Sequence, residues 1–152
     1  MKTTLFLSIL LVSFSSFALT FEVTEICEDK PLVSAEIPVL TLTNVLEFSK
    51  YHLKNLAIPH TINENGISSI LDTPVGYDAY EFVNYNHMRV YGWCYEVNGV
   101  QPNLVASEYI LDPETQDHIR WFYGYAEVVE GTWIYYCKPV YETRQAFACS
   151  MN

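Results

Sequence analysis

The sequence predicts an α+β protein in which one main helix packs on a mixed sheet. Two observations carry this prediction. Residues 44–58 form the only run with convincing helical periodicity. In contrast, residues 88–97 and 119–128 alternate aromatic and β-branched side chains with the period of two that is typical of strands. Half of the 152 residues are hydrophobic and only 17% are charged, which excludes a disordered chain.

The predicted helix has a recognisable start and end. Asn44 followed by Glu47 is typical of a helix N-cap and its partner three residues later. Pro59 is expected to end the helix. Phe48 and His52 fall on one apolar stripe, so we interpret His52 as a partly buried side chain rather than as a catalytic base.

The segments around the helix predict shorter elements. Residues 19–39 look extended, with Pro31 and Pro38 breaking the pattern. After the helix, the Asn-Gly pair at 65–66 predicts a turn, and residues 67–71 follow as a short strand.

The second half of the chain predicts the main strands. The run 88–97 ends at the Asn-Gly pair 98–99, a strong hairpin signal. The run 119–128 is followed by a turn at 130–131 and by a returning strand at 132–136. We therefore expect an added β-hairpin near the C-terminus.

The first residues predict export. The apolar run 5–12 precedes small residues, with Ser16 and Ala18 at the −3 and −1 positions of a cleavage site. That run is far shorter than the roughly 20 residues needed to span a bilayer, and no later stretch reaches that length. We expect residues 1–18 to be a signal peptide, residues 19–152 to form a single domain, and the mature protein to be secreted or periplasmic.

The charge balance excludes two classes of partner. The chain has 18 Asp and Glu against 8 Lys and Arg, a formal net charge of −10. Such a surface repels nucleic acid and anionic lipid headgroups. The expected partner is an unidentified small molecule or protein, with no nucleic acid and no membrane span.

The four cysteines predict two disulfides. An even number in a small exported domain favours disulfide pairing, and no C-x-x-C spacing indicates a metal site. Three pairings are possible for four cysteines. Because Cys94 and Cys137 both lie on predicted strands of the aromatic sheet, we expect them to pair with each other and Cys27 to pair with Cys149.

Two motifs in this order suggest a family. The sequence W-C-Y-E-V-N-G at 93–99 precedes D-H-I-R-W at 117–121, with the helix upstream. This pattern resembles the transcobalamin C-terminal-like family of exported β-grasp domains, most of them of unknown function, over roughly residues 41–125. The resemblance implies a β-grasp-like mixed sheet around one helix. In the vitamin B12 carriers this domain is one of two that enclose cobalamin; the other, a helical barrel, has no counterpart here.

The sequence contains no familiar catalytic motif. It lacks a G-x-S-x-G elbow, an H-E-x-x-H helix and a glycine-rich phosphate loop. The histidines are scattered, at His52, His60, His87 and His118. We therefore predict that the protein is not an enzyme, although a triad does not require residues that are close in sequence.

An acidic loop is the one candidate for a metal. Asp112, Glu114 and Asp117 carry carboxylates that could hold calcium, but their spacing is not that of an EF-hand. We interpret the segment as a solvated turn, and predict no metal and no cofactor.

The aromatic residues are the best candidates for function. The predicted ligand-binding residues are Trp93, Tyr95, Trp121 and Tyr123. Such rings either pack against the helix or form an exposed platform that binds a partner. We expect a non-enzymatic exported domain that binds a small soluble ligand or a protein partner through this face. The alternatives are a structural or envelope-associated interaction module and a hydrolase with an unrecognised site.

Overall fold

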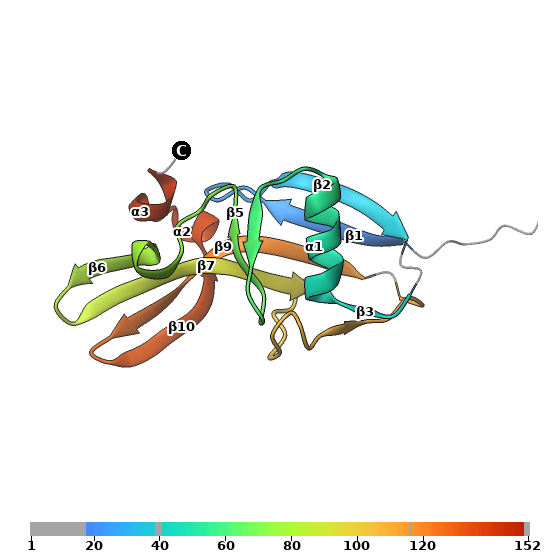
Figure 1. Cartoon of the computed structure of the whole chain (residues 1–152). Helices are drawn as coiled ribbons and strands as arrows, with labels where there is room; N and C mark the ends of the chain where they lie inside the picture. The colour runs from blue at the N-terminus through green and yellow to red at the C-terminus, as the bar shows by residue number, and fades with distance from the viewer. Residues whose placement is uncertain (1–17, 39–40, 116, 151–152) are drawn as a thin grey trace, which may run out of the picture.

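The computed structural model describes residues 18–38, 41–115 and 117–150, and Figure 1 shows their arrangement. The strands are β1 (Ala18–Thr24), β2 (Pro31–Pro38), β3 (Thr43–Asn44), β4 (His60–Ile62), β5 (Ile67–Ile70), β6 (Tyr80–Asn84), β7 (His87–Val97), β8 (Ile110–Leu111), β9 (His118–Val129) and β10 (Thr132–Pro139). The helices are α1 (Val45–Asn55), the short 3-10 helix η1 (Gly76–Ala79), α2 (Val140–Thr143) and α3 (Ala146–Cys149). The expected signal peptide lies outside the described residues except for Ala18, the first residue of β1.

Six strands form the main sheet, in the order β2-β1-β9-β7-β6, and β10 also pairs with β9. β1 runs parallel to β9, whereas every other pair in this sheet is antiparallel. β1 lies opposite residues 118–121 of β9, and β10 lies opposite residues 124–129. The two strands therefore flank successive parts of β9. The predicted α+β class and the hairpin of β9 and β10 are confirmed.

Helix α1 begins as the sequence predicts. The Asn44 side chain accepts a hydrogen bond from the backbone N–H of Glu47 at 2.8 Å, which satisfies one of the free N–H groups at the helix start. The helix ends at Asn55, before Pro59, and Ala57 turns the chain with a φ of 53°. The ring of Phe48 packs edge-on against Phe21 of β1 at 6.1 Å.

Three parts of the prediction need correction. Residues 31–38 form one strand, β2, because its two prolines stand at the ends of an edge strand, where a missing N–H is tolerated. Strand β6 was not predicted, although its residues pair regularly with β7. The C-terminal segment, which has no clear periodicity, forms α2 and α3.

The Asn-Gly pair at 98–99 forms the predicted turn, with φ values of 55° and 75°. It does not join two long strands. Beyond the turn only Val100 pairs back onto Val97, and the chain then continues as a loop over residues 101–109. This loop is held against α1 by hydrogen bonds from Val45 N–H to Tyr109 and from Leu46 N–H to Ala106.

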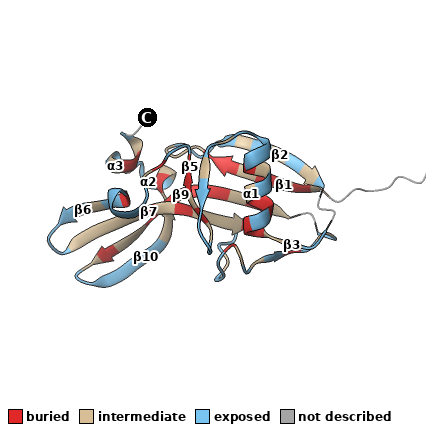
Figure 2. Ribbon diagram, viewed as in Figure 1, coloured by how far each residue is buried: buried red, intermediate tan, exposed pale blue. Residues whose placement is uncertain are grey.

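The core lies between the main sheet and α1, where Figure 2 colours much of β1 and β9 as buried. Phe21, Ile119, Trp121 and Tyr123 are all at most 1% exposed. Side chains of β10 are mostly exposed or half-buried. The sheet is therefore well covered on the α1 side and poorly covered toward β10.

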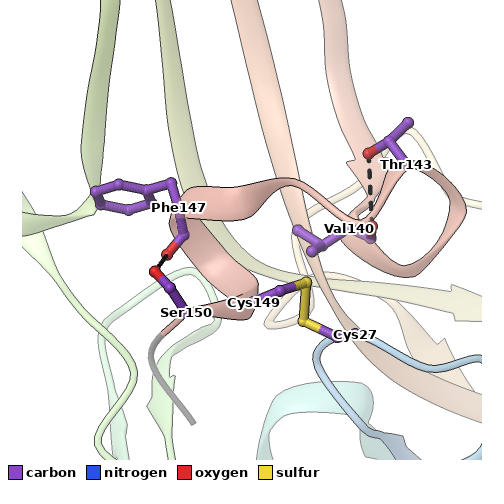
Figure 3. Close-up of a disulfide and its surroundings, with 6 residues drawn as sticks. All are labelled: Cys27, Val140, Thr143, Phe147, Cys149 and Ser150. Carbon is purple, nitrogen blue, oxygen red and sulfur yellow. Dashed lines mark hydrogen bonds between the residues drawn. A yellow bond between two sulfur atoms is a disulfide. The ribbon is translucent and has the colours of Figure 1, made fainter.

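Two disulfides hold the chain in place, in the pairing expected from the sequence. Cys149 in α3 is bonded to Cys27, which follows β1, with their Cα atoms 5.7 Å apart (Figure 3). Phe147, from the same helix, stacks on Tyr91 of β7 at 5.0 Å. The C-terminal segment is thus fixed to both the start of the chain and the middle of the sheet.

The second disulfide joins Cys94 of β7 to Cys137 of β10, across β9. In a flat sheet, two strands with one other strand between them lie about 10 Å apart. The two Cα atoms are only 6.5 Å apart, so β10 bends toward β7, and its register shifts mark the bend. Gly124 of β9 lies beneath the bridge: a Cβ there would be 2.8 Å from the sulfur of Cys137 and 3.2 Å from that of Cys94.

Candidate ligand cleft beside strand β7

A cleft lies where β7 loses its outer neighbour. β6 pairs with β7 only as far as Val90, so residues 92–96 of β7 are not paired with a further strand on that side within the described part of the chain. The cleft has a volume of about 620 Å³, which is in the usual range for small-molecule sites. Its walls are the β4–β5 turn and the loop 101–108, which are joined by a hydrogen bond from Ser107 N–H to the carbonyl of Asn65 at 3.4 Å.

Three of the four predicted ligand-binding residues line this cleft: Trp93, Tyr95 and Trp121. Tyr123 does not. Its side chain is fully buried, with its ring 5.5 Å from that of Trp93, so it contributes to the core instead. The ring of Tyr123 also lies 6.1 Å from that of Tyr91, so its neighbours on β7 pack against it on the helix side of the sheet.

The three lining rings are held rigidly by hydrogen bonds. Trp121 donates from Nε1 to Ser49 of α1 at 2.8 Å, and Trp93 donates from Nε1 to Thr73 at 2.8 Å. Tyr95 donates its hydroxyl hydrogen to the carbonyl of Leu104 at 2.7 Å. Burial raises the pKa of Tyr95 to about 12, so the phenol stays protonated at neutral pH. These rings offer the cleft apolar surface rather than free polar atoms.

Tyr136 of β10 is the lining residue that the sequence prediction missed. It is 80% exposed and stacks on Trp133 at 6.1 Å. The sequence placed it among the aromatic residues of the C-terminal hairpin, but gave no sign that the bend of β10 would bring it to β7. Trp93 and Trp121 are nearly buried, so Tyr136 offers the most accessible ring of the cleft.

The polar lining consists mainly of carboxamides. Asn65 and Asn103 are exposed, and Gln101 donates to the carbonyl of Cys137 at 3.1 Å. Glu108 is the only charged side chain, and the lining residues, all within the described ranges, include no His, Lys, Arg, Ser or Thr. The cleft therefore has hydrogen-bonding groups for a ligand but no nucleophile–base pair and no cation for an anionic ligand.

A charged network lies elsewhere, on β6, β7 and β9. Glu127 accepts hydrogen bonds from His87 at 2.7 Å and from Arg89 at 2.9 Å. Glu81 accepts from Arg89 at 3.1 Å and from Tyr91 at 2.6 Å. Burial alone would raise the pKa of Glu127, but the bonds from His87 and Arg89 outweigh it and hold that pKa below its ordinary value.

This network bears on the hydrolase alternative. A second cleft, of about 450 Å³, lies at the turns of the two hairpins and includes His87. No Ser, Thr or Cys is among its described lining residues, and Glu127 bonds both His87 and Arg89. The arrangement fits a cross-strand ion-pair network. The absence of enzymatic activity stays a prediction.

The opposite face of the sheet carries a second ion-pair group around Arg120. Its guanidinium donates to Glu22 at 3.0 Å and to Glu96 at 3.4 Å, also bonds Asp29, and lies 5.3 Å from the ring of Tyr141. Every hydrogen-bonding nitrogen of Arg120 therefore has a partner. This group links β1, β7 and β9 to the segment that carries Cys27.

The remaining candidates have local partners. His60 contacts the carbonyl of Ile58 at 2.8 Å, and His52 packs on Phe48 at 4.4 Å; burial lowers the pKa of His52. In the acidic loop, Asp112 accepts from the N–H of Glu114, and Asp117 accepts from Asn98. Within the described ranges no group of three or more His, Cys, Asp or Glu side chains is placed to hold a metal ion.

An exposed aromatic group stands on η1 and on the edge strand β6 that follows it. Tyr77, Tyr80 and Phe82 have ring centroids 5.9–6.2 Å apart and are all exposed. No helix among the described residues has the length and apolar character needed to cross a membrane.

Comparison of the chain with family models, with curated proteins and with solved structures found no match in any of the three.

Proposed function

We propose that the protein is an exported β-grasp domain that binds a small soluble ligand in the cleft beside β7. One observation carries the proposal: three aromatic residues chosen from the sequence, Trp93, Tyr95 and Trp121, line the same cleft. A mostly apolar cleft with a few convergent polar groups is the usual form of a small-molecule site.

The strand order supports the β-grasp assignment. A first hairpin, β1–β2, is followed by α1 and then by β7 and β9, and β1 runs parallel to β9 in the middle of the sheet. This is the arrangement that the proposed resemblance to the transcobalamin C-terminal-like family implies.

Export is supported by two features. The two disulfides fit an oxidising compartment outside the cytoplasm. The N-terminal sequence has the order of a secretory signal peptide. We propose that cleavage follows Ala18, which would remove one residue of β1.

Native mass spectrometry of protein purified from its own host tests ligand binding. We expect a complex heavier than the oxidised polypeptide, and loss of the extra mass after denaturation. Tyr136→Ala should lose the bound mass because it removes the accessible ring of the cleft. The matched control is Tyr85→Ala, which removes a fully exposed tyrosine outside this cleft. Equal retention by both variants would place the ligand elsewhere.

The aromatic group on β6 favours a second candidate, a protein-binding or envelope-associated module. Exposed aromatic side chains on an edge strand are a common feature of protein interaction sites. Phe82→Ser should abolish complex formation on chemical cross-linking in the host while leaving cleft binding intact. If the Phe82→Ser variant gives the same cross-linked species as the wild type, this candidate function is wrong.

A further inference from the structure

Successive residues of β7 point their backbone N–H and C=O groups alternately toward β9 and away from it. Val97 exchanges two hydrogen bonds with Val100, at 2.9 and 3.1 Å, on the side away from β9. The next residue, Asn98, donates its N–H to His118 at 2.9 Å, toward β9. In a strand, the N–H and C=O of one residue point to the same side, and those of the next residue point to the other.

This alternation places four backbone groups at the cleft. Counting back from Val97, the N–H and C=O of Tyr95 and Trp93 point away from β9, whereas those of Glu96 and Cys94 point toward it. β6 has ended before this point, and no described residue is hydrogen-bonded to the four groups. Trp93 and Tyr95 line the cleft, so its inner wall is an open strand edge.

Residues from both faces of β7 line the same cleft, as expected at a strand edge. Trp93 and Tyr95 belong to the face that packs toward α1, and Cys94 belongs to the face that carries the disulfide. Unpaired backbone groups near the protein interior favour a partner that supplies both donors and acceptors. An extended polypeptide does so at the spacing of alternate residues.

We propose that the ligand of this cleft is an extended peptide segment that adds to β7 as a further strand. The inference rests on the proposed binding function and names its ligand class. Trp93 and Tyr95 supply the main-chain hydrogen bonds, and the carboxamides of Asn65 and Asn103 on the walls offer further donors and acceptors to a peptide backbone. Tyr136 covers the apolar side chains of the peptide.

The charge of the protein limits the net charge that the bound peptide can have. The only charged lining residue is Glu108, and the whole chain carries a formal charge of −10. An acidic segment would meet repulsion with no compensating cation, whereas a lysine-containing segment is attracted and a neutral segment is not repelled. The peptide is therefore neutral or basic.

Amide hydrogen exchange of the ¹⁵N-labelled mature protein tests the open edge without any ligand. The amides of Cys94 and Glu96 should exchange slowly because they bond to β9, and those of Trp93 and Tyr95 should exchange at least about tenfold faster. Slow exchange at all four amides in the free protein would overturn the proposal.

Binding is then measured with a positional-scanning library of synthetic hexapeptides, blocked at both ends, in neutral, lysine-containing and glutamate-containing sets. We expect neutral or lysine-containing peptides to bind and to slow exchange at Trp93 and Tyr95. N-methylation of the peptide at every second residue should weaken binding about tenfold or more, and the intervening positions should tolerate it, because only one set of N–H groups faces β7. Tyr136→Ala should weaken binding, and Tyr85→Ala should not.

The outcomes separate this inference from the function on which it rests. If no peptide binds, or binding tolerates N-methylation at every position, the peptide assignment is wrong. If the native complex then retains a sugar or another small molecule, the proposal of ligand binding in the cleft stands and only the class of ligand changes. If the Tyr136→Ala and Tyr85→Ala variants retain the ligand equally, the ligand does not bind in this cleft and the proposed function is wrong.

Discussion

The inner half of the main sheet and its outer arm are built from the same two long strands but are stabilised in different ways. We define the inner half as β1, β2 and the parts of β7 and β9 behind α1, and the outer arm as β6, β10 and the remaining parts of β7 and β9. In the inner half, large rings are buried and the indole N–H of Trp121 has a partner on α1. In the outer arm, the Glu127–Arg89–Glu81 network crosses the strands, and aromatic rings face solvent.

The role of an aromatic residue in this sheet depends on the elements that cover it rather than on its place in the strand pattern. Trp121 and Trp133 both lie on strands of the β9–β10 hairpin, yet one is 1% exposed and the other 47%. α1 covers the first, and no described element covers the second. The cleft lies where the two regions meet, at the point where β6 ends and the bend of β10 brings Tyr136 close to β7.

The largest effect should come from comparing these two tryptophans. Trp121→Ala leaves a large cavity and removes the partner of Ser49, so it should cost about 3–5 kcal/mol of unfolding free energy. Trp133→Ala should cost less than about 1 kcal/mol because its ring is half exposed. Urea unfolding of both variants measures this; similar losses would contradict the division into two regions.

A smaller effect is expected at the junction. Gly124→Ala should cost about 1–3 kcal/mol because the new Cβ meets both sulfurs of the Cys94–Cys137 bridge and the carbonyl of Lys138. In a Cys94→Ala/Cys137→Ala background the same substitution should cost clearly less, because the sulfurs are gone. A double-mutant cycle by denaturant unfolding checks this, and an unchanged cost would mean that the bridge does not lie over Gly124.

Loss of the hydroxyl group should have different effects on stability at two buried tyrosines. The hydroxyl of Tyr123 is buried without a hydrogen-bond partner in the described part of the chain, so Tyr123→Phe should leave stability unchanged or raise it by up to about 1 kcal/mol. In the outer arm, Tyr91→Phe removes a 2.6 Å bond to Glu81 and should cost about 1–2 kcal/mol. Thermal melting compares the two, and a loss at Tyr123 would reveal a partner for its hydroxyl.

The smallest effect is a pH dependence of the outer arm. The folded-state pKa of Glu127 is held below its ordinary value of 4.5, so its contribution is present above that pH and is lost as the pH falls through the folded pKa. Glu127→Gln should therefore flatten the fall in stability below pH 4.5. The control is Glu36→Gln on β2, an exposed position that should leave the profile unchanged. Parallel profiles for wild type and Glu127→Gln would show that this carboxylate is not stabilised by folding.

Local sequence signals predicted the elements whose causes are local. Asn44 begins α1 because its side chain bonds an N–H three residues away, and the turns at 98–99 and 130–131 need residues that accept positive φ. The alternation of β7 and β9 follows from the two faces of a sheet. β2 was missed because its prolines read as breaks when the pairing that places them at the ends of an edge strand is unknown.

Local sequence patterns were enough to predict the α+β class, the start of α1, the long strands and three of the aromatic residues that line the cleft. Which aromatic side chains come together depends on how the strands pack. Tyr123 is kept out of the cleft because its ring packs against those of Tyr91 and Trp93. Tyr136 reaches the cleft because β10 bends over Gly124, and Trp93 and Tyr95 face an open edge because β6 stops short. The alternation of side chains along a strand is a local property, whereas burial and strand pairing depend on residues far away in the chain.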